Sequence, residues 1–183
     1  MNYWPAEPTN LGELHLPFIN YVINMAGRDN WKRAAREYGG VKNGWTCFTE
    51  NNIFGGMSLW GNNYFVANAW YCSHIWQHYR YTLDKDFLLR AFPTLWSCAQ
   101  FWMERMIDDR GCPELGIKPD GTFVAPDEFS AEQGDHPRED GTAHAQQLIY
   151  ARLTSVGKRA EILYPEVAEL PSEDLTRLDL FLE

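Results

Sequence analysis

The sequence predicts an all-α protein of antiparallel helices, interrupted by two long irregular segments. Apolar residues recur every three or four positions in several stretches, which is the spacing of one face of a helix. No stretch shows a convincing alternation of apolar and polar residues, although residues 121–124 could form a short extended piece. With 183 residues, the chain is long enough for one domain with a sizeable core.

Two helices are expected in the first forty residues. Asn10 and Glu13 match a capping box, and apolar spacing predicts an amphipathic helix from there to about Gly27. Asp29 can cap a second, shorter helix, which the glycines at 39–40 would end.

The first long irregular segment covers residues 40–63, where Gly, Asn and aromatic residues dominate and no helical period survives. Helical spacing resumes over residues 65–79. Asp84 is placed to cap the next helix, which Pro93 is expected to restart in a first turn and which then continues to about residue 107.

The second long segment, residues 108–139, is rich in carboxylates. A further helix is predicted up to residue 163, and Ser172 could cap a last one. Connections longer than about 12 to 15 residues inside a compact domain are usually functional or disordered. The aromatic content of these two segments is a poor composition for disorder, so we expect them to build a site on a helical scaffold.

Composition excludes several functions. A net charge of −9 without a cluster of basic residues argues against nucleic acid as a partner. No apolar run approaches the roughly 20 residues of a membrane span, and the N-terminus lacks the pattern of a signal peptide. The four cysteines form no CxxC pair, so a zinc cluster is not expected. We expect no cofactor. Aromatic residues make up 15% of the chain, and they can serve either as core or as flat faces for sugar rings.

Four segments together resemble the family 95 glycoside hydrolases: MNYWPAE (1–7), GWTCFTENNIFG (44–55), AWYCSHIWQHY (69–79) and APDEFSAEQGDHPREDGTAHAQQLIY (125–150). Members of that family are inverting glycosidases, chiefly 1,2-α-L-fucosidases, with some that act on α-L-galactosides. The resemblance implies an (α/α)6 toroid of six helical hairpins around a sugar-binding cleft. Residues 1–163 are similar to the first half of such a toroid, whereas residues 164–183 have no recognisable counterpart.

The resemblance also implies a catalytic residue. The general acid of the family is the Glu of a Ser-Pro-Glu segment, which here reads Ser-Ala-Glu and ends at Glu132. An inverting enzyme needs such an acid to protonate the leaving oxygen and a base to activate water on the opposite face. Asp127 and Glu128 are expected either to raise the pKa of Glu132 or to face solvent. Asp135, Glu139 and Asp140 fall where a helix should begin.

For the sugar itself, the candidates in the first long segment are Trp45, Glu50, Asn51 and Asn52. Trp45 could stack on an apolar sugar face, and the amides and the carboxylate could bond adjacent hydroxyls. Turn formation is an equal alternative for the two asparagines. His136, in the acidic segment, is a further candidate.

Three histidines, His74, His78 and His144, fall on predicted helices. With no third ligand at a plausible spacing, we interpret them as structural or rim residues and expect no metal site.

The opposite side of the active site is not expected in these residues. In the family, water is activated by an Asn pair just upstream of the MNYW block, with an Asp far downstream. We therefore expect the isolated chain to be inactive, with an oligosaccharide as substrate and a second half of the toroid as a possible partner. The family is mostly exported. Alternatives left open are another six-hairpin α-glycosidase or phosphorylase, a non-catalytic carbohydrate-binding protein, and a degenerate fragment.

Overall fold

The computed structural model describes residues 2–58, 64–111, 113–129 and 139–163, and within them the chain is mostly helical. The helices are α1 (Gly12–Ala26), α2 (Asp29–Glu37), α3 (Ala67–Thr82), α4 (Lys85–Arg105) and α5 (Ala143–Leu163). Two short strands, β1 (Ile107–Asp108) and β2 (Phe123–Val124), and a 3-10 turn, η1 (Pro113–Leu115), lie between α4 and α5. The predicted all-α class is confirmed.

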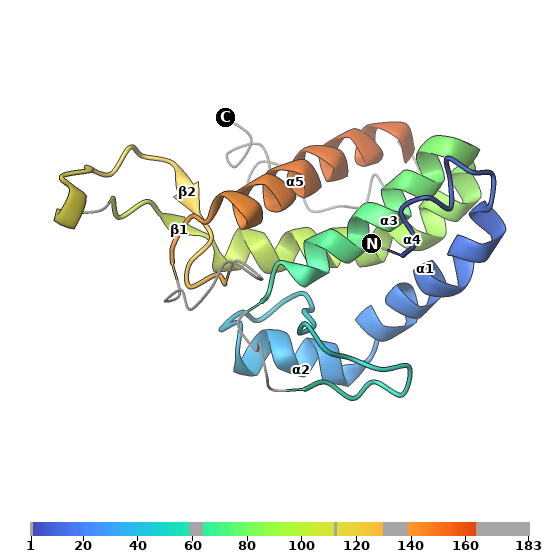
Figure 1. Cartoon of the computed structure of the whole chain (residues 1–183), viewed down its shortest axis with the longest axis horizontal. Coiled ribbons are helices and arrows are strands. Elements are labelled where there is room, and N and C mark those ends of the chain that lie inside the picture. The colour runs from blue at the N-terminus through green and yellow to red at the C-terminus, as the bar shows by residue number, and fades with distance from the viewer. Residues whose placement is uncertain (1, 59–63, 112, 130–138, 164–183) are drawn as a thin grey trace.

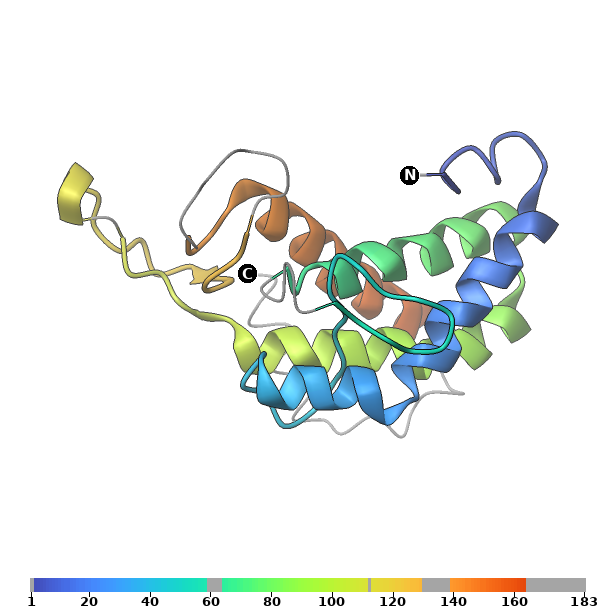
Figure 2. The same ribbon diagram turned by 60° about the horizontal axis from the view of Figure 1, so that its bottom comes forward.

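Helices α3, α4 and α5 lie side by side and pack against one another, and α1 and α2 cover one side of them (Figures 1 and 2). α3 and α4 are antiparallel because only two residues separate them. The first of these, Leu83, has a left-handed φ of 53° that reverses the chain. This pairing is the antiparallel helical hairpin that the sequence predicted.

Strands β1 and β2 pair antiparallel, with Ile107 opposite Val124, and form the base of an arm that extends away from the helices (Figure 1). The extended piece expected at residues 121–124 is therefore a strand only at its last two residues. Among the described helices, none is both long and apolar enough to span a bilayer.

The helix ends show which local signals operate. Asp84 caps α4 as predicted, since its Oδ1 accepts the N–H of Phe87 at 2.9 Å. The predicted capping box is wrong: Asn10 has a left-handed φ of 59°, whereas an N-cap needs an extended backbone, and the N-cap position of α1 is Leu11. Pro93 does not restart a helix either, because α4 continues through it for 21 residues.

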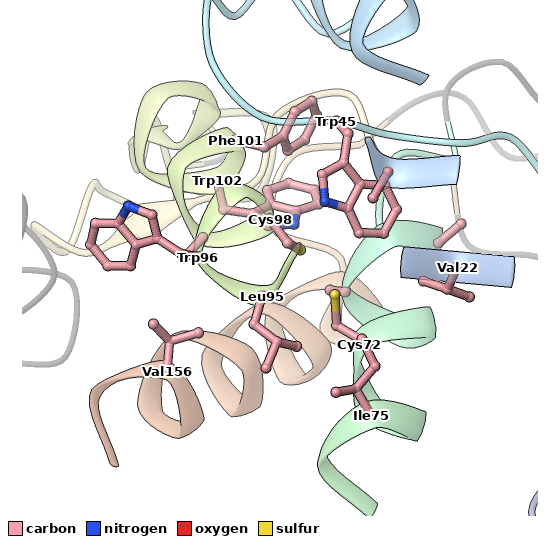
Figure 3. Packing of buried hydrophobic residues seen from close by; sticks show 14 of the residues in the cluster. Val22, Trp45, Cys72, Ile75, Leu95, Trp96, Cys98, Phe101, Trp102 and Val156 are labelled. Atoms are coloured by element: carbon pink, nitrogen blue, oxygen red, sulfur yellow. The ribbon is translucent and has the colours of Figure 1, made fainter. Parts of the chain in front are cut away.

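The core lies between the helices and the first long segment, and it includes the completely buried Trp45 and Trp102 (Figure 3). Trp31 is completely buried as well. The Asn68 side chain joins two of these residues: its Oδ1 accepts the Trp102 indole N–H at 2.8 Å, and its Nδ2 donates to the Trp45 carbonyl at 2.8 Å. The buried Cys72 of α3 lies in the same core. These contacts fix the first long segment to α3 and α4 as part of the fold.

Candidate active site

A pocket of about 430 Å³ opens beside the N-terminal half of α3, and we call it the aromatic pocket. Its size is within the range of small-ligand sites, roughly 300 to 1,000 Å³. Its lining consists mainly of aromatic side chains: Asn2, Tyr3, Phe18, Phe48, Thr49, Tyr64, Ala67, Trp70, Tyr71 and His74. An apolar wall with a few polar groups suits a sugar, whose ring presents C–H faces and a rim of hydroxyls.

The helical repeat of α3 builds one wall of the aromatic pocket. Ala67, Trp70, Tyr71 and His74 are spaced three, one and three residues apart, so they share one face of the helix. Phe18 of α1 approaches from the other side, and its ring meets that of His74 edge to face at 5.0 Å between centroids. The pocket is therefore positioned by two packed helices.

His144, at the start of α5, contacts two residues that line the aromatic pocket. Its Nε2 lies 2.6 Å from the Tyr64 hydroxyl, and its ring meets the Trp70 ring at 5.4 Å between centroids. Burial lowers the pKa of His144, which favours the neutral ring as acceptor of the Tyr64 O–H. The interpretation of His144 as a rim residue agrees with this placement.

Four buried polar residues lie next to the aromatic pocket, and we call them the Glu–His cluster: Glu7, His15, His74 and His78. Oε1 of Glu7 is 2.8 Å from Nδ1 of His15 and 2.6 Å from Nδ1 of His78. Nε2 of His15 is in turn 2.8 Å from Nδ1 of His74. Sequence spacing gave no sign of this cluster, because Glu7 comes from outside the helices and His15 from a different helix than the other two histidines.

Three atoms of this cluster are of the type that binds metals. Glu7, His15 and His78 each offer one ligand atom, and these atoms all lie within 4.8 Å of one another, so the third ligand that the sequence did not reveal is present. Ligand atoms around a tetrahedral zinc ion are about 3.3 Å apart, given bonds of about 2.0 Å. The 2.6 and 2.8 Å separations are instead those of hydrogen bonds, so these side chains form a hydrogen-bond network.

The structure corrects the prediction that Trp45 stacks on a sugar. Its side chain is 0% exposed, it stacks on Trp31 at 5.2 Å, and its indole N–H donates to the Thr94 carbonyl at 3.1 Å. A ring with no free face belongs to the core. Trp70 is half-buried and lines the aromatic pocket, so it is the tryptophan of this pocket that a ligand could reach.

The other candidates of the first segment lie together. Glu50, Asn51 and Asn52 line a small pocket of about 340 Å³. The Asn51 amide is engaged within the protein, since Tyr21 donates to its Oδ1 and its Nδ2 lies 3.2 Å from the Tyr71 hydroxyl. Asn52 forms a turn, with its Oδ1 accepting backbone N–H groups at 2.9 and 3.2 Å. The alternative of turn formation therefore describes Asn52, while Glu50 remains exposed.

Glu132 and His136 lie outside the described residues, but the two flanks of their segment are described. Residues 128 and 139 form an antiparallel bridge, with N–H to O distances of 3.0 and 3.4 Å. Asp140 strengthens it by accepting the backbone N–H of Asp127 at 3.0 Å. Residues 128 and 139 thus lie beside one another, and Asp140 supports this stem immediately before α5.

Arg105, at the end of α4, ties both long segments together. Its guanidinium donates to the carbonyls of Gly39 and Pro126, each at 2.9 Å, and lies 4.0 Å over the Phe65 ring. Its Nε is 3.6 Å from Oε1 of Glu128. One cation therefore joins the residue that immediately precedes the first segment to the stem of the second.

Glu128 is completely buried, so the expectation that it could face solvent is wrong. Burial raises its pKa to about 8, although Arg105 and the backbone N–H of Val66 act in the opposite direction. The carboxyl group therefore holds its proton at neutral pH. Its negative form would also oppose ionisation of Tyr64, which indicates that it lies near the wall of the aromatic pocket.

Comparison with known proteins agrees with these features. Residues 1–177 match the model of the glycosyl hydrolase family 95 catalytic domain. The chain is 32% identical over 158 residues to "Probable alpha-fucosidase A" of Aspergillus niger, covering 82% of this chain and 19% of that protein. It is 34% identical over 138 residues to "Alpha-L-fucosidase 2" of Arabidopsis thaliana, covering 69% of this chain and 16% of that protein.

The chain thus spans less than a fifth of the length of these curated relatives. The family match covers every residue that lines the aromatic pocket. It also covers the two residues that form the stem of the acidic segment. The arrangement of its antiparallel helices agrees with a partial helical toroid, and the chain belongs to glycosyl hydrolase family 95.

Proposed function

We propose that this chain is part of an inverting glycoside hydrolase that acts on α-L-fucosides, with the aromatic pocket receiving the sugar. The observation that carries the proposal is the family match over residues 1–177, together with relatives named as fucosidases. The aromatic pocket supports it, because Trp70 and Tyr71 offer the apolar surface that a fucose ring with its C6 methyl group would cover.

Glu132 is the proposed general acid. Inversion requires an acid and a base about 6.5–9.5 Å apart, on opposite faces of the sugar. The stem formed by residues 128 and 139 supports the assignment, because it holds the two flanks of the acidic segment on the side of Tyr64, a pocket residue. His136 and Glu50 are proposed to contact more distant parts of the substrate.

Binding and turnover test different parts of the proposal. We expect L-fucose to perturb the fluorescence or the NMR signals of the 183-residue chain, and maltose to have no effect at the same concentration. A Trp70→Ala variant should lose the response while retaining its circular dichroism spectrum. Equal binding of maltose would instead favour a six-hairpin enzyme for α-glucosides.

Measuring turnover tests the proposed role of Glu132 as the general acid. We expect no hydrolysis of 2′-fucosyllactose by the 183-residue chain, because inversion also requires a base that the resemblance assigns to other residues. If turnover is observed, Glu132→Gln should abolish it, with Asp127→Asn as the matched control in the same segment. Loss of turnover in the control and not in Glu132→Gln would move the acid to Asp127.

A further inference from the structure

The Glu–His cluster forms a hydrogen-bonded chain that ends at the aromatic pocket. Glu7, His15 and His74 are 6%, 0% and 4% exposed, so water has little access to their polar atoms. The chain runs from Oε1 of Glu7 to Nδ1 of His15 at 2.8 Å, and from Nε2 of His15 to Nδ1 of His74 at 2.8 Å. His74 is the member that also lines the pocket.

The proton positions in this row of hydrogen-bonded side chains follow from the charge of Glu7. Burial raises the pKa of Glu7, but hydrogen bonds from His78 and His15 outweigh it and leave the pKa below its usual value. The ionised carboxylate can only accept, so Nδ1 of His15 and Nδ1 of His78 each carry a proton. When His15 carries only this Nδ1 proton, its Nε2 is a lone-pair acceptor, and Nδ1 of His74 is then the donor to it.

The same logic fixes the remaining nitrogen of His74. Burial lowers the pKa of His74 to about 4, so the ring is neutral at physiological pH. A neutral imidazole carries one proton, and here that proton is on Nδ1. Nε2 is left as an acceptor, and no described residue hydrogen-bonds to it.

We propose that Nε2 of His74 accepts a hydrogen bond from a hydroxyl group of the sugar in the aromatic pocket, and that Glu7, acting through His15, holds His74 in the required tautomer. The inference rests on the proposed function, since it needs a sugar in this pocket. His74 is then a specificity-determining residue, because a ring position without a hydroxyl would leave a buried acceptor unpaired. Glu7 and His15 are positioning residues that touch no ligand.

The tautomer can be measured without any sugar. In the intact chain labelled with ¹⁵N-histidine, we expect the NMR shifts of His74 at pH 7 to show a protonated Nδ1 and an unprotonated Nε2. Glu7→Gln keeps the side-chain shape but removes the negative charge, so it should shift His74 toward the opposite tautomer. Finding Nε2 protonated in the unmodified chain would overturn the inference, whatever the chain binds.

Two isosteric replacements then test the contact with sugar. His74→Asn places an amide N–H where Nδ1 was and removes the acceptor at Nε2, so L-fucose binding should weaken about tenfold. His74→Gln places an amide oxygen near the position of Nε2 and should bind within about threefold of the unmodified chain. The exposed Asp86→Ala on α4 is the control, and the melting temperature of each variant reports its folding.

The outcomes separate the inference from the proposed function. If the unmodified chain binds L-fucose and His74→Asn binds equally well, the inference is overturned while the sugar pocket stands. If the unmodified chain does not bind L-fucose, the assignment of the pocket falls, and the inference falls with it. The expected tautomer together with selective loss in His74→Asn supports both.

Discussion

Two tryptophans in this protein differ in role, since Trp45 belongs to the core and Trp70 lines the aromatic pocket. Trp45 is enclosed by Trp31 and the backbone of α4, and Trp70 is half-buried in the wall of the aromatic pocket. Trp45→Ala should therefore lower the free energy of unfolding by about 3–5 kcal/mol, measured by urea denaturation. Trp70→Ala should affect stability less and abolish L-fucose binding. A Trp45→Ala chain of normal stability that fails to bind sugar would contradict this division.

Glu128 gives the protein a defined response to pH. Its pKa is about 8 when folded, against 4.5 as its reference, so between these values the folded state holds a proton that the unfolded state has lost. The free energy of unfolding should therefore fall as the pH rises from 5 to 8, by up to about 1.4 kcal/mol per pH unit from this group.

Glu128→Gln is the matching variant, since its side chain has the same shape and no titration. Urea denaturation at pH 5, 7 and 8.5 should show a smaller decline in the variant than in the unmodified chain. If both decline equally, the carboxyl is ionised in the folded protein and Arg105, 3.6 Å away, determines its charge.

At the scale of single elements, the cap of α4 offers a direct test. Asp84→Ala removes the acceptor of the Phe87 N–H and should cost about 1 kcal/mol of the free energy of unfolding. Asp86→Ala is the matched control, because Asp86 lies exposed in the first turn, where its charge favours the helix dipole but it is not the N-cap. Equal losses in the two variants would show that charge, and not the cap, stabilises this end.

The elements also show what sequence reasoning can reach. The cap at Asp84 was predictable because the residue and the N–H it accepts are three positions apart. The conformation of Asn10 was not predictable, because asparagine is common both at the N-cap of a helix and in a left-handed turn. Pro93 gave a false break, because packing of α4 in the core outweighs one missing hydrogen bond.

Long-range contacts explain the rest of the difference at the site. His74 and His78 are four residues apart on one helix face, which the sequence shows, but Glu7, the partner of His78, is 71 positions away, and His15, the partner of His74, is 59 positions away. Trp45 was assigned to a ligand because its segment lacks a helical period, yet Thr94 binds it from 49 positions away. Pairing between distant segments decides whether such residues form core or surface, and spacing alone does not contain it.

At the scale of the whole molecule, the arm between β1 and β2 is separate from the helical body (Figure 2). Trypsin should cut after Arg110, whose side chain is 70% exposed, well before it cuts after Arg105, whose side chain is 9% exposed. Mass spectrometry of a time course measures the order. Since the helices do not depend on the arm, the circular dichroism spectrum should persist after the first cut; its loss would show that the arm supports the helices.

Arg105 also has a consequence for the order of folding. Its bonds to Gly39 and Pro126 join residues 66 and 21 positions away, so each closes a large loop of chain at an entropic cost. Helices α3 and α4 meet through a two-residue turn and can associate first. We therefore expect the two long segments to bind to the helices last. In native-state hydrogen exchange, both segments should open together at a lower free energy than α3 and α4.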